Sequence, residues 1–258
     1  MNILVFDIET VPDVESARRL YDLEGLGDKE VAEVMFSQRR QATGGSSDFL
    51  KHHLHKVVAI SVVLRTTEKI SLWSLGDPES PENELVKRFF DGIERYSPML
   101  VSWNGGGFDL PVLHYRALLH GISASRYWET GDEDQSFRWN NYISRYHERH
   151  TDLMDIITGY DYRATAPLTE VASMLGFPGK MGMSGDKVWD TYTNGDIDAI
   201  RHYCETDVLN TYLIFLRYEL MRGRKTQLGI DEECKRLREM LQAENKPHLQ
   251  QFLQTWLS

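Results

Sequence analysis

Two carboxylates stand two residues apart near the N-terminus, directly after the apolar residues 3–6. That run is typical of a buried strand, and Asp7 and Glu9 lie at its end. In an extended chain, residues i and i+2 project from the same face, so both carboxylates would converge on one point above a sheet. Acids at strand ends also occur as simple solvated groups, so the pair alone leaves both interpretations open.

A third carboxylate, Asp109, follows a second short apolar run, residues 99–103, across a turn of three glycines at 105–107. Glycine lets the backbone take a positive φ or approach a ligand closely. Asp109 also suits the start of a helix, with Pro111 just inside it, and Asn104 suits a turn. This segment therefore places a carboxylate either beside a ligand or at a helix cap.

A tyrosine and a fourth carboxylate share one face of a helix that the hydrophobic pattern predicts over residues 196–217. Tyr203 and Asp207 are related as i and i+4. That face is otherwise apolar, and a carboxylate is costly to bury there unless it is paired or binds a metal. Glu205 points elsewhere, and we expect it to be solvated.

Oxygen ligands of this kind suit hard cations such as Mg²⁺ or Mn²⁺, whereas structural zinc favours cysteine and histidine. The predicted metal ligands are Asp7, Glu9, Asp109 and Asp207. Asp152 and Asp155 are the alternatives for the third position, and we favour Asp109 because its motif is fuller.

The three motifs together resemble those of the DEDD exonuclease superfamily. They are Phe6-Asp7-Ile8-Glu9-Thr10, Asn104-x-x-x-Phe108-Asp109 and Tyr203-x-x-x-Asp207, in that order. The tyrosine resembles the DEDDy branch, which includes the proofreading domains of family B DNA polymerases. Residues 203–211 and 150–155 further resemble the stand-alone 3′–5′ exonucleases related to those domains. The sequence departs from the family in an insertion at 13–56, and residues 222–258 are too few to form a polymerase.

The resemblance implies an RNase H-like fold and hydrolysis of single-stranded DNA from its 3′ end with two divalent cations, Mg²⁺ or Mn²⁺. Asp7 would bridge both ions, Glu9 and Asp207 would complete the first site, and Asp109 would serve the second. Tyr203 would orient the attacking water, and Glu9 would contact the terminal 3′ hydroxyl. The substrate contacts within the motifs would be Ile8, Thr10, Asn104 and Phe108.

Three other functions compete with this one. An exoribonuclease on the same fold differs only in its substrate. A nucleic-acid-binding module with lapsed catalysis belongs to another class, but an intact set of motif residues argues against it. A hydrolase of small nucleotides is favoured only if long strands are not bound.

The elements that must position these residues follow from the hydrophobic pattern. We expect strands at 2–6 and 99–103, a hairpin at 57–65 and 69–75, and helices at 82–96, 110–120, 167–175, 196–217, 230–244 and 248–257. This order predicts an α/β fold in which an antiparallel hairpin lies next to parallel strands, flanked by helices. The predicted domains are an exonuclease domain at 1–221 and a C-terminal helical extension at 222–258. Within the insertion, 16–41 reads as one helix.

The charge limits how nucleic acid would be held. The chain has 39 acidic against 29 basic residues, a net charge of −10, which excludes general coating of nucleic acid by a basic surface. Two local tracts, 36–56 and 217–225, each carry four basic residues against one acidic residue and could hold a strand. Aromatic and basic residues alternate at 137–149, which fits either base stacking or a loop packed over its own rings. His52, His53 and His55 indicate a positive patch.

Cellular location is constrained only by absences. The cysteines, Cys204 and Cys234, form neither a disulfide framework nor a Cys-x-x-Cys pair, as is usual in a reducing compartment. No apolar run approaches the roughly 18 residues that span a membrane, and the N-terminus has no basic leader. We expect a soluble cytoplasmic protein with no membrane partner.

Overall fold

The computed structural model describes residues 2–179 and 181–257. Its centre is a mixed sheet of five strands in the order β3-β2-β1-β4-β5. The strands are β1 (Ile3–Pro12), β2 (His55–Arg65), β3 (Ile70–Ser74), β4 (Met99–Ser102) and β5 (His150–Asp152). β1, β2 and β3 pair antiparallel, whereas β1, β4 and β5 run parallel. The predicted α/β class, with an antiparallel hairpin beside parallel strands, is confirmed, and the arrangement is RNase H-like.

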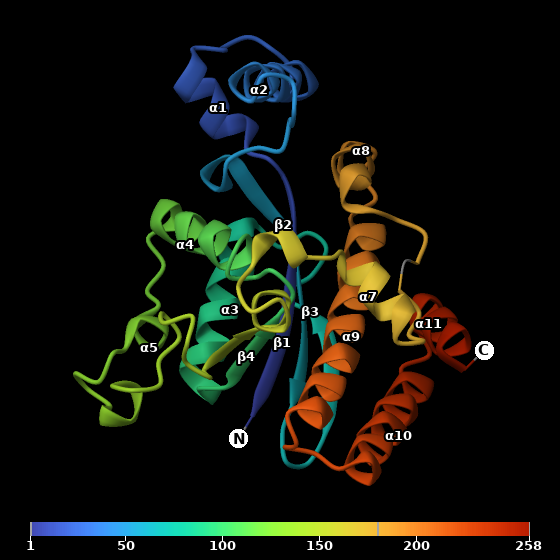
Figure 1. Ribbon diagram of the computed structural model, residues 1–258. Coiled ribbons are helices and arrows are strands. Elements are labelled where there is room, and N and C mark those ends of the chain that lie inside the picture. The colour runs from blue at the N-terminus through green and yellow to red at the C-terminus, as the bar shows by residue number, and fades with distance from the viewer. Residues whose placement is uncertain (1, 180, 258) are drawn as a thin grey trace.

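Helices cover both faces of this sheet (Figure 1). On one face lie α3 (Glu82–Tyr96) and α4 (Asp109–His120), and on the other lies the long helix α9 (Ile197–Met221). Because side chains alternate along a strand, Leu4, Phe6 and Ile8 pack in the core under α3 and α4, whereas Val5 packs in the core under α9. The same alternation turns Asp7 and Glu9 toward α9.

β1 is longer than the sequence pattern predicts, because it continues beyond the acidic pair to Pro12. Its register with β2 shifts between Glu9 and Thr10. Such a bulge bends a strand and changes the direction of the side chains that follow it. The irregularity therefore falls directly after the second carboxylate of the first motif.

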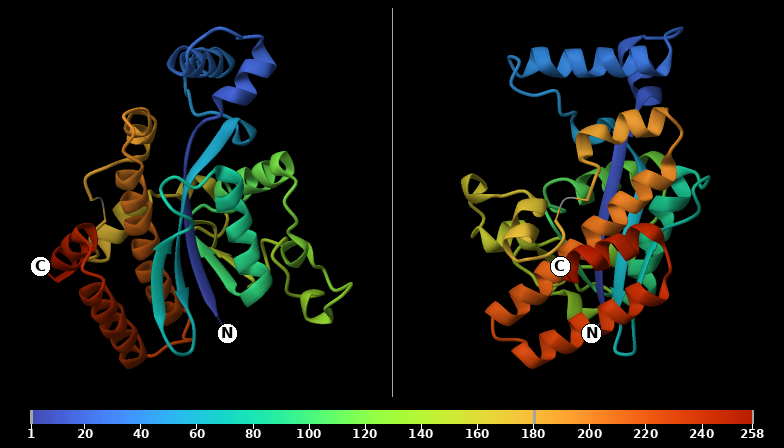
Figure 2. Two further views of the ribbon diagram at one scale, coloured as in Figure 1. Left: turned by 180° about the vertical axis from the view of Figure 1, so that it is seen from behind. Right: turned by 90° about the vertical axis from the view of Figure 1, so that its right-hand side faces the viewer.

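The insertion forms a separate small lobe at the end of β1 and β2, at the top of Figure 1 and in both views of Figure 2. It contains α1 (Val14–Tyr21), α2 (Asp28–Ala42) and the short 3₁₀ helix η1 (His52–Leu54), which share their own apolar cluster. The prediction of one helix over 16–41 is wrong. Gly25 takes a φ of 94° between the helices, and Gly27 caps α2, with the Glu30 side chain accepting from its amide.

The segment after α4 is largely irregular, as expected. The remaining helices are α5 (Ser125–Trp128), α6 (Leu153–Ile157), α7 (Leu168–Met174) and α8 (Val188–Thr193), with 3₁₀ turns η2 (Gln135–Phe137), η3 (Tyr162–Ala164) and η4 (Gly185–Lys187). Phe137 and Tyr142 are 1% and 2% exposed, so these rings pack beneath the loop. Trp139 and Tyr146 are 81% and 75% exposed. The segment 137–149 therefore contains both rings that pack beneath the loop and rings that are open to a base.

The last two helices, α10 (Gln227–Ala243) and α11 (Pro247–Leu257), pack against α9 and belong to the same apolar core as the sheet. They bury Glu205, which we expected to be solvated. Its carboxylate accepts hydrogen bonds from Ser74 Oγ at 3.0 Å and Lys246 Nζ at 3.5 Å, and pairs with His248 Nε2 at 2.7 Å. That expectation was wrong because these partners come from β3 and from the junction of α10 and α11.

In the part of the chain that the structure describes, no helix combines the length and apolar character needed to cross a membrane.

A buried ion network joins the insertion to the body. Arg116 of α4 donates to Glu82 at the start of α3 and to Asp13, which caps α1. Glu82 also accepts from the Val57 amide at 2.6 Å and contacts His120 Nε2 at 2.8 Å. Arg116 is 4% exposed, so its removal would leave two carboxylates buried without their cation.

We expect Arg116→Met to lower the free energy of unfolding by about 3–5 kcal/mol, the usual cost of breaking a buried ion pair on one side. Thermal unfolding followed by circular dichroism measures this. Arg88→Met is the matched control, because Arg88 pairs with Glu84 at the surface and such pairs contribute about 1 kcal/mol or less. Equal melting temperatures for the two variants would contradict the assignment.

Candidate active site

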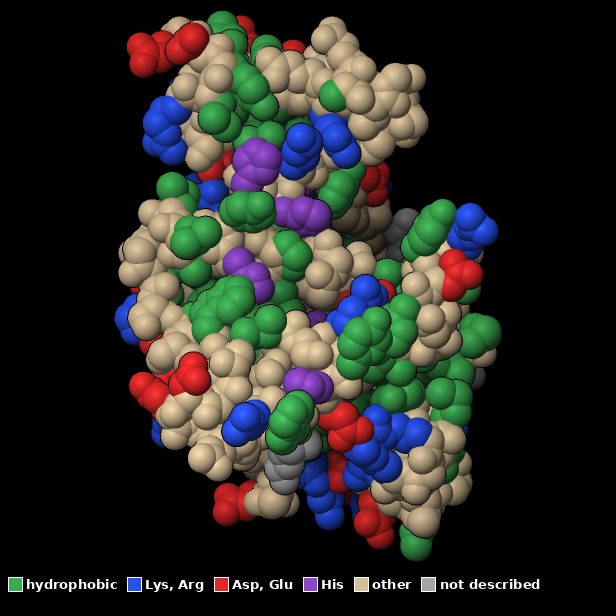
Figure 3. All heavy atoms as spheres, turned by 60° about the vertical axis from the view of Figure 1, so that its left-hand side comes forward, with side chains coloured by type: hydrophobic (Ala, Val, Ile, Leu, Met, Phe, Trp, Pro, Cys, Tyr) green, Lys and Arg blue, Asp and Glu red, His purple; other side chains and the backbone are tan. Residues whose placement is uncertain are grey.

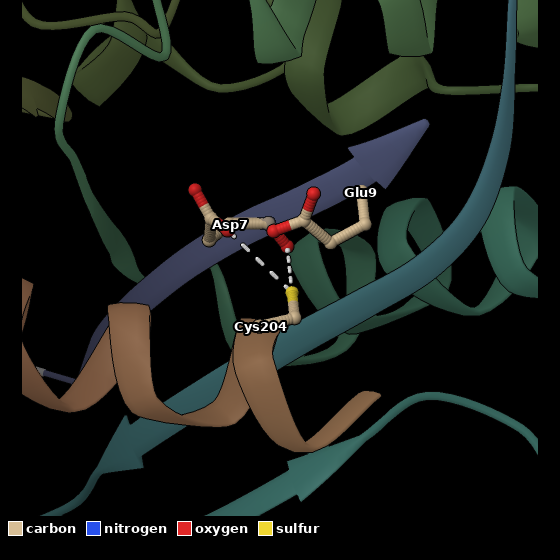
Figure 4. A group of neighbouring side chains, drawn as sticks. All are labelled: Asp7, Glu9 and Cys204. Carbon is tan, nitrogen blue, oxygen red and sulfur yellow. Dashed lines mark hydrogen bonds between the residues drawn. The ribbon is translucent and has the colours of Figure 1, made fainter. Parts of the chain in front are cut away.

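Asp7 and Glu9 lie on β1 and face α9, and the side chain of Cys204 projects from α9 toward them (Figure 4). One ligand-type atom from each of these three residues falls within 4.8 Å of the others. Glu9 is 8% exposed. The first motif therefore places two carboxylates in a largely buried position.

Cys204 is a site residue that the sequence analysis missed. Its thiol donates to the backbone oxygen of Asp7 at 3.4 Å and to Asp7 Oδ2 at 3.6 Å. Burial, followed by the charges of Asp7 and Glu9, raises the pKa of this thiol well above its usual range, so it is a neutral donor. Its spacing of three residues from Asp207 is the signal that could have placed it on the same helix face.

α9 brings the third motif to this point. The helix begins at its cap, Asp196, whose side chain accepts from the Ala199 amide. Tyr203 and Asp207 lie one turn apart on α9, and each shifts the pKa of the other. Burial, together with the charges of Asp207 and Glu9, raises the pKa of the Tyr203 phenol far above its ordinary value. The phenol therefore stays protonated and can orient a group but cannot act as a base.

The second motif enters from the turn before α4. Asn104 takes a left-handed φ of 63°, and its backbone oxygen accepts from the amides of Gly107 and Phe108. A Cβ on Gly107 would lie 2.4 Å from the Asn104 side-chain oxygen, so glycine is required there. Asp109 is the first residue of α4, while Phe108 holds the cap position. Asp109 Oδ1 instead accepts from the Ile8 amide at 3.1 Å, which ties the second motif to the first.

The two alternatives to Asp109 have other contacts. Asp152 accepts from the amides of Asn104 at 2.9 Å and Gly106 at 2.8 Å, and so braces the glycine turn from behind. Asp155 pairs with Arg145 at 2.8 Å. Neither contact directs these carboxylates at Asp7.

The four motif carboxylates are linked electrostatically. Burial raises the pKa values of Asp7 and Glu9 well above their usual range, and the charges of Asp109 and Asp207 raise both further. Burial also raises the pKa values of Asp109 and Asp207 to about 7. Buried carboxylates without cationic partners are costly when ionised. The cluster therefore favours either protons or cations.

Two cavities meet at the cluster, and Ile8 and Phe108 line both. The smaller, of about 480 Å³, lies beside Asp7 and Asp109 and continues along Met154 and residues 165–168. The larger, of about 620 Å³, lies beside Glu9 between the insertion and α8. Thr10 lines the larger cavity and Asn104 the smaller. All four predicted substrate contacts thus line these cavities.

His52 and His55 contact the site, and His55 does not contribute to the positive patch that we expected. Burial lowers the pKa of His55 to about 4, so its ring is neutral. Its Nδ1 contacts Thr10 Oγ1 at 2.8 Å, and its ring meets Phe108 edge to face with centroids 5.1 Å apart. His52 Nε2 contacts the Gly107 oxygen at 2.9 Å. These rings hold the first two motifs against the insertion.

Four of the eight basic residues in the two tracts form ion pairs. Arg222 and Arg224 pair with Glu148, and Lys225 pairs with Glu233. This tract also starts near the end of α9, about 15 Å along the helix axis from Asp207. In the first tract, Arg40 pairs with Asp48. On the face in Figure 3, Lys and Arg side chains are scattered among acidic ones and form no continuous basic surface.

Comparison with known proteins identifies the family. The sequence model of a family described as "Predicted 3'-5' exonuclease related to the exonuclease domain of PolB" matches residues 47–256. The chain belongs to this family. Asp109, Tyr203 and Asp207 lie inside the matched residues, whereas Asp7 and Glu9 precede them. The predicted relationship to the stand-alone exonucleases of family B polymerase type is confirmed.

This chain is similar to two DNA polymerases, to one in structure and to the other in a short stretch of sequence. The structure of the family B DNA polymerase from the hyperthermophilic archaeon Pyrobaculum calidifontis matches 93% of the chain with a TM-score of 0.50 and 17% identity. "DNA polymerase 1" of Sulfurisphaera ohwakuensis is 51% identical over 37 residues, 14% of this chain. The chain spans 28% of the first protein, and the second match covers 4% of its polymerase. The structural likeness supports the shared fold.

The raised pKa values predict how stability depends on pH. Asp109 and Asp207 titrate near 7 in the folded protein but near 3.9 when unfolded. Between these values the folded state binds more protons, so stability falls as pH rises, by about 1 kcal/mol per pH unit for each group. We expect the melting temperature in a chelator to fall from pH 5 to pH 8.

An Asp109→Asn/Asp207→Asn double variant is the control, because it cannot release these two protons and should show a flatter pH dependence. Mg²⁺ or Mn²⁺ should raise the wild-type melting temperature most at pH 8. A wild-type profile no steeper than that of the double variant would count against the pKa assignment.

Proposed function

We propose that this chain is a metal-dependent 3′–5′ exonuclease that hydrolyses the phosphodiester bonds of single-stranded DNA. One observation carries the proposal. Asp7, Glu9 and Asp109 line two adjoining cavities, and Asp7 and Glu9 interact electrostatically with Asp207 and with a protonated Tyr203 on α9. The family match independently supports 3′–5′ exonuclease chemistry.

The donor set fits two divalent cations, Mg²⁺ or Mn²⁺. Asp7, Glu9, Asp109 and Asp207 offer hard oxygen ligands, and Cys204 is a neutral thiol that does not turn the site into a zinc centre. When bound, a pair of such ions lowers the pKa of water and offsets the charge on the phosphate and leaving oxygen. The raised pKa values support this assignment, because cations would remove the cost of ionising all four carboxylates.

The protein's own groups position the reactants. The Tyr203 hydroxyl, held against Asp207, would orient the attacking water by a hydrogen bond. Glu9 borders the larger cavity and would accept a hydrogen bond from the terminal 3′ hydroxyl. The scissile phosphate would lie at the junction of the two cavities, beside Ile8 and Phe108.

In this proposal, the parts of the substrate on the two sides of the scissile phosphate lie in different cavities. Aromatic and acidic side chains line the larger cavity, and no lysine or arginine among the described residues lines it. The aromatic residues include Phe36, Phe49, Phe108 and Trp189, and the acids are Glu9, Asp48, Asp186 and Asp190. Aromatic walls suit a nucleobase, and acidic walls repel phosphate. The larger cavity would therefore take the uncharged terminal nucleoside, and the smaller cavity would take the strand that precedes it.

DNA is the preferred substrate in this proposal, because the two similar proteins described above are DNA polymerases. RNA from the 3′ end is the second candidate on the same site. We also propose a reducing, cytoplasmic location, because both cysteines are free thiols.

Incubation of 5′-labelled single-stranded DNA and RNA with Mg²⁺ or Mn²⁺ tests the activity. A ladder that shortens from the 3′ end of DNA supports the proposal, and a ladder on RNA alone supports the exoribonuclease. Binding without cleavage by the metal-loaded protein would indicate a lapsed site.

We expect Asp7→Asn to reduce cleavage to the assay background, because it removes the carboxylate that would bridge both ions. Tyr203→Phe should be milder, about 10- to 100-fold slower, since it removes an orienting group. Initial rates on labelled DNA measure both.

Asp91→Asn is the matched control, because Asp91 is an exposed carboxylate on α3 and its loss should leave the rate unchanged. In a chelator, Asp7→Asn should melt no lower than wild type, since it removes one like charge. Full activity of Asp7→Asn would sink the proposal, and a Tyr203→Phe enzyme as slow as Asp7→Asn would disprove the orienting role.

A further inference from the structure

Three tyrosines stand out from the body of the protein beside the smaller cavity. Tyr146 and Tyr162 are 75% and 77% exposed, and Tyr160 is 36% exposed. We call these three rings, with Arg145 and Arg163, the tyrosine platform. In the right-hand view of Figure 2, the yellow segment between β5 and α7, which carries Tyr160 and Tyr162, projects from the body.

The platform is ordered by its own contacts. The rings of Tyr146 and Tyr160 meet edge to face with centroids 5.3 Å apart. The Arg145 guanidinium lies 4.6 Å from the centre of the Tyr160 ring, and the Tyr160 hydroxyl donates to the Arg145 backbone oxygen at 3.0 Å. The Arg163 guanidinium lies 5.6 Å from the Tyr162 ring. The aromatic faces are therefore held in place while remaining open to solvent.

Backbone strain accompanies this arrangement. Tyr160 takes a left-handed φ of 65°, which is rare for a bulky residue. Its amide donates to the Asp155 oxygen at 2.8 Å, so the turn is anchored to α6. Unfavourable backbone of this kind persists only where surrounding contacts fix it. Here it presents an aromatic ring that contributes little to the core.

The platform is continuous with the smaller cavity. Thr165 lines that cavity, and its hydroxyl donates to the Tyr162 backbone oxygen at 2.9 Å. Met154 lines it too and begins the turn that leads to Tyr160. A strand that leaves the cavity past these residues meets the exposed rings next.

Single-stranded nucleic acid is the occupant that this chemistry fits. Successive bases stack on aromatic side chains irrespective of sequence, and arginine adds attraction to the backbone. Two acids lie at the platform. Asp155 pairs with Arg145, and the Asp161 side chain accepts from the Arg163 backbone amide at 2.9 Å. The Arg163 guanidinium contacts the Tyr162 ring and would supply the charge that attracts a phosphate.

We propose that the tyrosine platform binds the single-stranded part of the substrate on the 5′ side of the scissile phosphate. This inference rests on the proposed function, because it continues the path from the proposed cleavage point. The platform would supply affinity for long strands without taking part in chemistry. It gives an acidic protein a local means of holding a polyanion.

Fluorescence anisotropy with a labelled 12-nucleotide oligo-dT, in a chelator so that no strand is cut, tests the binding directly. The Tyr160→Ala/Tyr162→Ala variant should bind at least about tenfold more weakly, because each stacked base contributes about 1–3 kcal/mol. The Tyr160→Phe/Tyr162→Phe variant keeps the rings and should bind as wild type does. Arg163→Ala should reduce the salt slope by about 0.7.

Kinetics separate a strand platform from a structural role. With the 12-mer, the double alanine variant should raise KM and leave kcat unchanged. With a dinucleotide, which ends inside the smaller cavity, its kcat/KM should equal that of wild type. Trp139→Ala, which removes an exposed ring outside the platform, should change neither parameter.

Unchanged 12-mer binding by the double alanine variant would overturn the inference, and so would an equal loss of activity on the dinucleotide. These outcomes are distinct from failure of the proposed function. Wild-type protein that cuts no nucleic acid would refute the exonuclease, while the binding comparison in chelator would still decide the platform.

Discussion

Mutual repulsion among buried carboxylates is the constraint around which this protein is arranged. Asp7, Glu9, Asp109 and Asp207 come from three elements. Burial raises the pKa of each, and the charges of Asp109 and Asp207 raise those of Asp7 and Glu9 further. Hydrogen bonds offset part of the cost, because Cys204 donates to Asp7 and the Ile8 amide donates to Asp109. Tyr203 lowers the pKa of Asp207. The electrostatic cost that remains favours the uptake of protons or cations.

Because the carboxylates repel one another, other residues must hold the motifs in place. The structure does this with polar contacts, which we call braces. Asp152 fixes the glycine turn through two backbone amides. His55 holds Thr10 and Phe108 from the side of the insertion. Glu205, between Tyr203 and Asp207 in sequence, anchors α9 to β3 and to the last two helices. Asp152 and His55 come from segments remote in sequence from the motifs that they support, and Glu205 anchors its own motif through partners that are remote in sequence.

The parts that sequence predicted well depend on local periodicity. Alternation along β1 places Asp7 and Glu9 on one face, and helical spacing pairs Tyr203 with Asp207. The mixed sheet followed from the order of apolar runs. Glu205 and His55 were misjudged because their surroundings depend on long-range partners. Burial of Glu205 requires Lys246 and His248, and neutrality of His55 requires the packing of Phe49 and Phe108. The spacing of residues along the chain does not predict such long-range contacts.

The two ends of the insertion are hydrogen bonded to each other at its base. The Asp13 amide donates to the Leu54 oxygen at 2.8 Å, and Arg116 grips Asp13 immediately beside this bond. The chain thus enters and leaves the lobe at adjoining points, and the lobe has its own apolar cluster. Loop-closure entropy grows only slowly with length, so a lobe with such a narrow base can lengthen, shorten or be exchanged at little thermodynamic cost to β1. Changes of size there would remodel the wall of the larger cavity and leave the carboxylates in register.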